Sequence, residues 1–319
     1  VVAPILAREL KQRGIKGEPL VAHSYERVMP GPNYVRSIES FWRTFAGLSS
    51  EAADRAEAFL STVVNTSDFP LRRLEDPTAS ELAKVLENSY RAANIAFIQE
   101  WTLAAEELGV NLFEVVDSVA VRRGTHDNIM RPGFGVGGYC LTKDGYLAQW
   151  GVRELFGGST ELGVTLRALD INYQMPRHSF DLLQSAMGDL RGKTVLVAGI
   201  SYLGDVADTR NSPTAEFCDL LLGAGARPLV SDPHVRHWPE RPSVPWVDFE
   251  EGFTDAGAVV LAVRHAPYLK LDPEIFAGKR SMVLLDTQNL IDDVKADRVH
   301  ALGHLPVGVG KGHWRKRYI

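Results

Sequence analysis

Four glycines within six residues constrain this chain more than any other feature of its sequence. They occupy positions 133, 135, 137 and 138, and residues 133–138 are called the glycine loop below. A residue without a Cβ lets the backbone approach a ligand closely, and this loop leads to Cys140, with Lys143 and Asp144 three and four residues later. A nearby cation or a helix N-terminus lowers the pKa of a thiol and makes it a better nucleophile. The stretch therefore predicts a reactive cysteine near a helix start, with a buried structural cysteine as the alternative.

The same glycines also satisfy a dinucleotide-binding pattern, G-x-G-x-x-G, between positions 133 and 138. That pattern binds a dinucleotide only when a hydrophobic strand comes directly before it. The preceding stretch, THDNIMRP at residues 125–132, is polar and ends in a proline. We therefore do not predict a dinucleotide site at this place.

Length and composition limit the classes of protein that fit. The 319 residues predict two or three domains, and the net charge of −5 gives no electrostatic support for binding nucleic acid. Two cysteines in so long a chain fit a reducing compartment, so we expect a cytoplasmic protein. No apolar run approaches the roughly 20 residues of a membrane span. The one basic cluster, at residues 311–317, is predicted to be a solvated tail.

Residues 1–75 have the pattern of the end of an α/β domain. We predict a helix over residues 1–13, a strand at 20–22, a loop at 23–31, a helix at 51–61 and a strand at 62–64. A loop after a strand is a usual place for ligand contacts in such sheets. Glu26 in that loop is therefore a candidate site carboxylate, and an exposed surface glutamate is the alternative.

Residues 76–189 are predicted to be helical. A capping box at Thr78 and Glu81 predicts the start of a helix that runs over residues 79–108, on which Lys84 and Asn88 share a face. Further helices are predicted at 111–121, 143–150 and 159–187, the last with a kink at Pro176 and a role as domain connector and dimer surface. An apolar stripe on the first of these helices is expected to be core, and comprises Leu82, Val85, Leu86, Ile95, Phe97, Ile98 and Leu103.

Residues 190–319 alternate strands and helices, which predicts a parallel sheet. Strands are expected at 193–198, 228–231, 258–263 and 282–286, and a helix at 213–222 with Ser212 as its N-cap. A strand, a glycine turn, a helix and a strand ending in Asp232 indicate nucleotide binding, although the spacing of Gly199 and Gly204 is not the dinucleotide fingerprint. The predicted fold is thus α/β, with two Rossmann-like parallel-sheet units, the first incomplete, joined by a central helical domain with a long connecting helix.

Five stretches of the chain occur in the order of one known family. They are SYERVMPG at 24–31, ELAK at 81–84 with Asn88, GVGGYCLTKD at 135–144, VLVAGISY at 195–202 with DTRNSP at 208–213, and DTQN at 286–289. On these residues, over about positions 1–295, the chain resembles the nucleotide-sugar dehydrogenases of the UDP-glucose, GDP-mannose and UDP-N-acetylhexosamine group.

The resemblance implies a reaction and roles for particular residues. Such enzymes oxidise a primary alcohol of the sugar to a carboxylate in two hydride transfers to two NAD⁺. Cys140 would attack the aldehyde intermediate and later carry a thioester, Lys84 and Asn88 would stabilise the developing oxyanion, and Asp144 would handle the proton of the alcohol or water. Glu26 resembles the glutamate that assists thioester hydrolysis.

The resemblance also implies ligand contacts and a partner. Lys143 would contact NAD, no metal is expected, and the central helices would form a homodimer. The residues expected to bind the nucleotide sugar are Arg123, Arg131, Phe134, Gly135, Gly137, Gly138, Tyr139, Tyr202 and Arg210.

Departures from the family leave alternatives open. The family's N-terminal dinucleotide-binding motif, which holds NAD, is missing from these residues, so we expect the chain to be part of a longer dehydrogenase. A second reading is a non-catalytic nucleotide-sugar-binding or dimerisation module, because Leu203 and Gln288 replace a lysine and an arginine common in the family. A third reading makes residues 190–319 the NAD site, with Asp232 on the ribose. The sugar and the nucleotide base stay unassigned.

Overall fold

A computed structural model describes all 319 residues, which separate into two compact units, Val1–Glu87 and Asn88–Ile319. The long helix α4 (Pro77–Leu108) begins in the first unit and continues into the second. Each unit is described by itself. The division predicted from the sequence, into residues 1–75, 76–189 and 190–319, stays a prediction.

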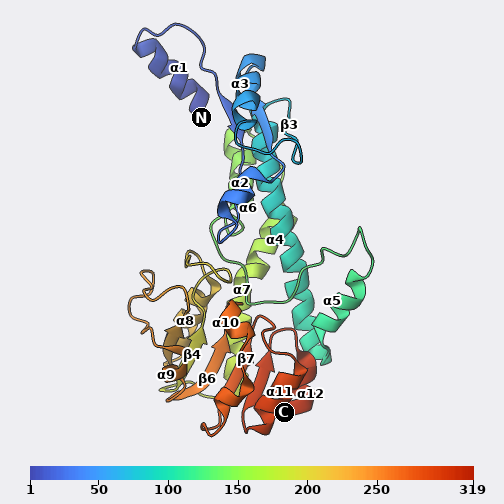
Figure 1. Cartoon of the computed structure of the whole chain (residues 1–319), viewed down its shortest axis with the longest axis vertical. Coiled ribbons are helices and arrows are strands. Elements are labelled where there is room, and N and C mark those ends of the chain that lie inside the picture. The colour runs from blue at the N-terminus through green and yellow to red at the C-terminus, as the bar shows by residue number, and fades with distance from the viewer. The chain divides into compact units, whose positions relative to one another are not determined.

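The first unit is a small three-stranded sheet with helices (Figure 1). It comprises α1 (Val2–Gln12), β1 (Ala22–Ser24), α2 (Tyr34–Glu39), β2 (Thr44–Gly47), α3 (Ser50–Leu60), β3 (Arg72–Arg73) and the start of α4. β2 lies in the middle, antiparallel to β1 and parallel to β3, so this sheet is mixed. Its core is small, with Phe45, Ala53 and Leu60 buried together.

The two helices predicted in the first unit are confirmed, but one predicted strand is wrong. Residues 62–64 are not a strand, because the backbone amides of Val63 and Val64 both donate to the carbonyl of Leu60 and form a turn that ends α3. The central strand β2 was not expected from the sequence. The predicted strand at 20–22 lies two residues later, as β1.

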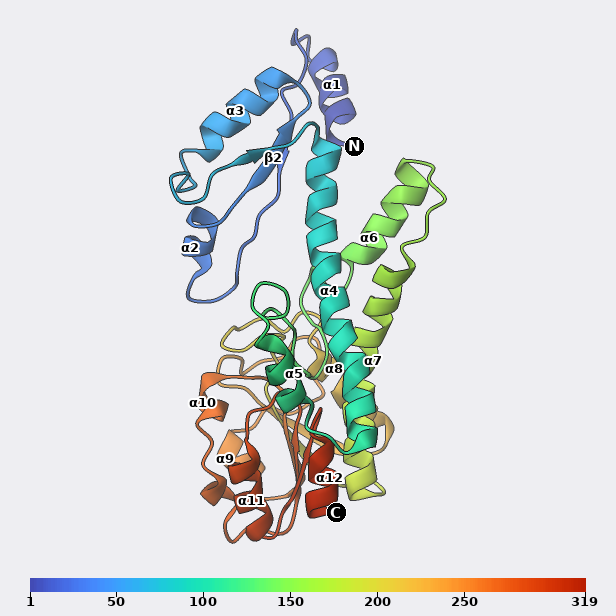
Figure 2. The ribbon, with the colours of Figure 1, turned by 90° about the vertical axis from the view of Figure 1, so that its right-hand side faces the viewer.

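The helical part of the second unit contains the rest of α4, α5 (Leu112–Ala120), α6 (Asp144–Trp150), the π-helical turn η1 (Gly151–Leu155) and α7 (Gly163–Met187). The second half of α4 and α7 lie side by side in Figure 2, joined by a 2.9 Å hydrogen bond from the Asn172 amide to the Ala92 carbonyl. The predicted long helix is confirmed, and it ends at Leu108, directly before Gly109, which has a φ of +66°.

Two predictions about α4 are wrong. The helix begins at Pro77, and the Asp76 carboxylate accepts the Ala79 amide, so Asp76 caps the helix and Thr78 already lies inside it. The apolar stripe is only partly core, because Ile98 is 3% exposed whereas Phe97 is 56% exposed. The other stripe members that are exposed are Leu82, Leu86 and Leu103. Part of the apolar surface of α4 is therefore left uncovered by this chain.

The rest of the second unit is a five-stranded parallel sheet of order β5-β4-β6-β7-β8. Its strands are β4 (Thr194–Ala198), β5 (Arg227–Ser231), β6 (Ala256–Leu261), β7 (Val283–Asp286) and β8 (Leu305–Gly308). The helices around it are α8 (Pro213–Gly223), α9 (Phe249–Gly252), α10 (Ala266–Leu269), the 3₁₀ helix η2 (Pro273–Phe276), α11 (Asp293–Ala301) and α12 (Gly312–Tyr318).

Alternate residues of β4 enter two different cores, as the pleat of a strand requires. Val195 and Val197 pack in the cluster that includes residues of α7 and α8, whereas Leu196 and Ala198 pack in the cluster that includes residues of α11 and α12. Both faces of the sheet are covered, which is usual for an all-parallel sheet. The α/β class and the parallel sheet predicted from the sequence are confirmed.

The predicted solvated tail is wrong, because its residues fold as α12 after β8. Trp314 is 1% exposed and Lys311 is 4% exposed, while Arg315, Lys316 and Arg317 are exposed. Residues 311–317 look solvated in the sequence because most of them are basic. Only Trp314 is a large apolar residue, and the buried Lys311 cannot be told from an exposed lysine by sequence. β8 and α11 were also not expected. None of the helices combines the length and the apolar character that crossing a membrane requires.

Candidate active site

Cys140 lies in the turn that leads into α6. Its carbonyl accepts the backbone amides of Lys143 at 3.1 Å and Asp144 at 2.9 Å, and α6 begins at Asp144. Cys140 is half-buried. Cys218, by contrast, is fully buried in the sheet core, and this burial raises the pKa of its thiol.

The glycine loop is seated against the turn that follows β4. A Cβ at Gly137 would lie 2.7 Å from both the Asn211 carbonyl oxygen and the Tyr202 Cβ, and a Cβ at Gly138 would lie 2.9 Å from the Tyr202 ring. The Gly138 amide donates to the Arg210 carbonyl at 3.1 Å, and the Asn211 side-chain amide donates back to the Gly138 carbonyl at 3.1 Å. At these two positions the space that the sequence suggested for a ligand is occupied by the protein itself.

The first half of the loop is also packed into the protein. Phe134 is 1% exposed, and its ring centroid lies 5.3 Å from that of Phe217 in α8. Gly135 has a φ of +126°, and a Cβ there would lie 3.2 Å from the Asn172 carbonyl. A buried Phe134 ring is a core side chain, so this residue has only its backbone to offer a ligand.

Asp144 is a buried carboxylate with both oxygens bonded. It is 6% exposed and accepts the Asn88 side-chain amide at 2.6 Å and the Lys143 ammonium at 2.9 Å. Lys143 remains partly accessible, with 44% of its side chain exposed. Asp144 therefore bonds to two other residues that the sequence singled out, Asn88 and Lys143, next to the turn that carries Cys140.

Lys84 and Glu26, which belong to the first unit, also pair. The Lys84 ammonium donates to the Glu26 carbonyl at 2.8 Å and lies 3.7 Å from a Glu26 carboxylate oxygen. It also lies 5.7 Å from the centroid of the Tyr25 ring. The Glu26 side chain is 53% exposed, which agrees with the alternative of an exposed surface glutamate, although the Lys84 ammonium contacts it. Its role as a site carboxylate stays a prediction.

Three expected substrate residues, Tyr139, Tyr202 and Arg210, gather around the loop. The Arg210 guanidinium lies 5.0 Å from the Tyr139 ring centroid and bonds to Asp208, and this pairing lowers the pKa of Asp208 and raises that of Arg210. Burial raises the pKa of Tyr202, with further contributions from Asp208 and Cys140.

The other two expected arginines do not bond to the glycine loop. Arg131 pairs with Asp117 of α5, and Arg123 is exposed without a side-chain hydrogen bond. One residue that the sequence analysis missed is Arg91 of α4, whose charge lowers the pKa of Tyr202. The signal was present, since Arg91 follows Asn88 by three positions on the same helix.

A cavity of about 810 Å³ opens beside the glycine loop. This volume is within the range of small-molecule sites. Its walls come from the loop, α6, α7 and the N-terminal end of α8, and include Tyr139, Lys143, Tyr146, Asn172, Tyr173 and Asn211.

Asp232 is not available to a ribose, which removes the structural basis of the third reading. The residue is 2% exposed, and the amides of Ile200 and Ser201 and the ring of His265 all donate to its Oδ2. The amides of His234 and Val235 donate to its Oδ1. A carboxylate with five donors holds turns together instead of facing a ligand.

Two models of one protein family match the chain. The central domain of the UDP-glucose/GDP-mannose dehydrogenase family matches residues 78–172, and the UDP-binding domain of the same family matches residues 196–293. Together these ranges span more than half of the chain. The chain belongs to the UDP-glucose/GDP-mannose dehydrogenase family.

Individual relatives agree with this assignment. The chain is 31% identical, over 92% of its length, to the UDP-N-acetyl-D-mannosamine dehydrogenase of Pyrococcus horikoshii, and 29% identical, over 88%, to the NDP-N-acetyl-D-galactosaminuronic acid dehydrogenase of Ralstonia nicotianae. It spans 65% and 63% of the lengths of these two proteins. The crystal structure of an NDP-N-acetyl-D-galactosaminuronic acid dehydrogenase from Methanosarcina mazei Go1 superposes with a TM-score of 0.82 at 30% identity, covering 92% of this chain and 63% of that one.

The candidate residues of this UDP-glucose/GDP-mannose dehydrogenase family member fall in both matched domains. Lys84, Asn88, the glycine loop, Cys140 and Asp144 lie in the central-domain match, whereas Tyr202 and Arg210 lie in the UDP-binding match. Glu26 lies in neither.

Proposed function

We propose that this chain binds a UDP-N-acetylhexosamine and carries the cysteine of an NAD-dependent dehydrogenase that oxidises the sugar's C6 alcohol to a carboxylate. The observation that carries the proposal is the half-buried Cys140 directly before α6, beside an Asp144 whose two oxygens are held by Asn88 and Lys143. The choice of an N-acetylated sugar rests on the names of the relatives from Pyrococcus horikoshii and Ralstonia nicotianae.

The chemistry assigned to the chain's own residues is nucleophilic addition and thioester hydrolysis. The Cys140 thiolate adds to the C6 aldehyde, a C–S bond forms, and the carbonyl electrons move to oxygen, where the Lys84 ammonium and the Asn88 amide stabilise the charge. In hydrolysis, water adds to the thioester carbon, the C–S bond breaks and Cys140 leaves as thiolate. Asp144 takes the proton of the attacking water, and Glu26 assists.

NAD⁺ would accept the two hydrides of this four-electron oxidation. The residues of this chain do not fit its pyrophosphate, because the strand–glycine–helix turn of the first unit, at residues 47–50, contains one glycine and lacks the spaced glycines of the dinucleotide pattern. A Cβ at Gly47 would lie 2.3 Å from the Ala53 amide nitrogen, so α3 sits directly on the turn. Lys143 is the one residue that we propose to contact NAD, and we assign no reaction step to this contact.

The remaining features of the proposal concern organisation. We propose the three-domain division at residues 75/76 and 189/190, a cytoplasmic location, and a homodimer formed by the central helices. The dimer is supported by large apolar side chains on α4 that this chain leaves exposed, among them Leu86, Phe97 and Trp101.

The first test is alkylation of Cys140 with iodoacetamide at neutral pH, followed by mass spectrometry with and without UDP-N-acetyl-D-mannosamine. We expect fast labelling that the sugar nucleotide slows, with the buried Cys218 as an internal control that stays unlabelled. Slow labelling that occurs only at alkaline pH would favour the second candidate, a nucleotide-sugar-binding module without catalysis. The replacement of the family's common lysine and arginine by Leu203 and Gln288 supports that candidate.

Turnover gives the matching activity test. NADH formation from a panel of UDP- and GDP-sugars would be compared for the 319-residue chain and for a version extended at its N-terminus by a dinucleotide-binding segment. In the extended version, Cys140→Ser should lower turnover by at least about 1,000-fold, because it removes the nucleophile. Unchanged turnover in this variant would refute the cysteine mechanism, and binding of sugar nucleotide without turnover in any version would favour the binding module.

A further inference from the structure

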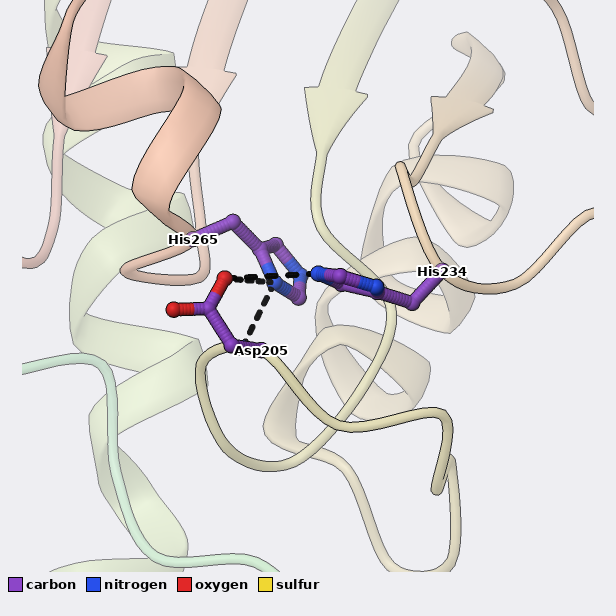
Figure 3. A group of neighbouring side chains, drawn as sticks. All are labelled: Asp205, His234 and His265. Atoms are coloured by element: carbon purple, nitrogen blue, oxygen red, sulfur yellow. Dashed lines mark hydrogen bonds and ion pairs between the residues drawn. The ribbon is translucent and has the colours of Figure 1, made fainter. Parts of the chain in front are cut away.

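Three turns at the carboxyl ends of neighbouring strands bring two histidines and an aspartate together (Figure 3). Asp205 follows β4, His234 follows β5 and His265 follows β6, and β4 lies between the other two strands. In a parallel sheet the chain crosses to opposite sides at such a point, and the crevice outside these strand ends is the usual ligand position.

The ligand-capable atoms lie at distances that one metal ion would bridge. Asp205 Oδ1 is 3.3 Å from His234 Nε2 and 3.8 Å from His265 Nδ1, and all three atoms lie within 4.8 Å of one another. Ligands about 2.1 Å from a zinc ion in a tetrahedral arrangement are roughly 3.4 Å apart. The cluster is therefore near the required spacing.

A buried carboxylate orients both imidazole-bearing residues. Asp232 accepts His265 Nε2 at 3.0 Å on one oxygen and the His234 backbone amide at 2.8 Å on the other. With its proton on Nε2, the neutral His265 ring has its lone pair on Nδ1, which faces Asp205. A carboxylate that bonds the far nitrogen of a histidine in this way is the usual outer partner of a metal-bound imidazole.

The Asp205 turn is held in place by its backbone. A Cβ at Gly204 would lie 2.2 Å from the Arg264 carbonyl oxygen, so only glycine lets this turn lie so close to the one that carries His265. Asp205 itself has a φ of +58°, a conformation that aspartate and asparagine tolerate better than most residues. The Ala266 amide donates to the Asp205 carboxylate at 2.9 Å and fixes its orientation.

We propose that Asp205, His234 and His265 bind one divalent transition-metal ion of the zinc type, with Asp232 as the outer partner of His265. Two imidazoles and a carboxylate are the donors that suit Zn²⁺, and they leave a coordination position open to water or another ligand. None of these four residues is assigned a role in the proposed dehydrogenase chemistry, although Asp205 lies on the segment that carries Tyr202 and Arg210.

Ion binding replaces a hydrogen bond at one ligand. His265 Nδ1 accepts the Asp205 backbone amide at 2.9 Å, and a metal ion at the same lone pair displaces that amide. Because Asp205 lies on the segment between Tyr202 and Arg210, this segment has to adjust when the ion binds. Binding should thus be detectable as a change in the environment of the 201–210 segment as well as in ion content.

The experiment uses the full chain with any affinity tag removed, because a polyhistidine tag binds the same ions. Co²⁺ is titrated in and its visible absorption is followed, then Zn²⁺ is added to displace it. Asp205→Asn keeps the size and the positive φ of the residue, and His234→Ala removes a side chain that is about one-third exposed, so neither should prevent folding. His237→Ala, on the same loop and fully outside the cluster, is the matched control, and Cys140→Ser removes the competing thiol.

We expect one Co²⁺ per chain in the parent, in His237→Ala and in Cys140→Ser, displaced by Zn²⁺. Asp205→Asn and His234→Ala should each weaken binding at least about tenfold, with unchanged urea midpoints. Binding within twofold of the parent in both variants, loss of binding in His237→Ala or Cys140→Ser, or no stoichiometric binding in the parent would each overturn the proposal.

Discussion

Two buried aspartates stand at strand ends of the same sheet, and they do different things. Asp232 follows β5 and Asp286 ends β7, and they are 2% and 0% exposed. Each accepts backbone amides of turns at the carboxyl ends of the strands. For Asp232 these are the amides of Ile200, Ser201, His234 and Val235, and for Asp286 those of Gln288, Leu290 and Ile291.

The difference lies in the side chain opposite each carboxylate. Asp286 faces the Lys311 ammonium at 3.4 Å, and Lys311 lies 4.0 Å from the centroid of the buried Trp314 ring. Asp232 faces His265, which can be neutral and presents a second nitrogen to Asp205. At Asp286 the hydrogen-bonded group ends with the buried Lys311. At Asp232 it extends through His265 to Asp205, which is partly exposed. The partner, and not the strand-end aspartate, decides whether such a turn is structural or able to bind.

The largest expected effect is on the arrangement around Asp286. Asp286→Asn leaves the Lys311 charge buried without a counter-charge, so the free energy of unfolding should fall by about 3–5 kcal/mol. Urea unfolding followed by tryptophan fluorescence measures this. Adding Lys311→Met in the same chain should recover part of the loss; a double variant less stable than Asp286→Asn would contradict the role given to this pair.

A smaller effect is expected on the arrangement around Asp232. Asp232→Asn has the same shape, and four of the five donors to this side chain are backbone amides, so the loss should be about 1–3 kcal/mol from weakened hydrogen bonds. The same urea titration applies. Equal losses for Asp232→Asn and Asp286→Asn would break the comparison between the two aspartates.

The two arrangements should also respond to opposite ends of the pH range. Burial would raise the pKa of Asp232, but the bonds from His265 and the backbone amides outweigh it, so the folded pKa lies below the ordinary value. Its contribution to stability is therefore complete above about pH 4 and is lost as the pH falls through the folded pKa. The stability gap between the parent and Asp232→Asn should narrow in acid.

For Lys311, burial lowers the pKa, so the charged form is disfavoured in the folded chain. That penalty disappears as the pH rises through the folded pKa toward the unfolded value of about 10.4. The parent should gain stability relative to Lys311→Met over this alkaline range. Urea midpoints at a series of pH values test both trends, and an acid response at Lys311 or an alkaline one at Asp232 would count against them.

The smallest effect is expected on the outer face of α12. Arg317 pairs with Asp297, and both side chains are nearly half exposed. Arg317→Ala should change the free energy of unfolding by no more than about 1 kcal/mol. Trp314→Ala on the buried face is the matched comparison and should cost about 3–5 kcal/mol. A similar cost for both variants would mean that charge, and not burial, holds this helix.

Much of the fold was predictable from the sequence, because long periodic segments and strand–turn–helix punctuation are strong local signals. α4, α7, β4 to β7 and the Ser212 cap of α8 were expected within a few residues. The errors arose where tertiary contacts decide the outcome. Val63 and Val64 suit a strand but end a helix, and the sequence around Trp314 looks solvated although the sheet core receives it.

The candidate site was predictable in part for the same reason. Asn88, Lys143 and Asp144 could be chosen by residue type and motif, and the structure joins them. The sequence could not show why the loop needs its glycines, since only the fold reveals that Gly137 packs against Asn211 and Tyr202. The cluster of Asp205, His234 and His265 has no sequence signal either, because about 30 residues separate each member from the next.

The segment between β8 and α12 has a consequence for how the chain is made. The Gly310 amide donates to Glu106, the Gly310 carbonyl accepts Leu112 and the Lys316 ammonium donates to the Leu108 carbonyl. These contacts join residues about 200 positions apart. During synthesis from the N-terminus, about 200 further residues therefore have to be made before the end of α4 finds these partners. Until then the apolar side chains at the end of α4 are exposed to solvent. A chaperone can bind them during this interval.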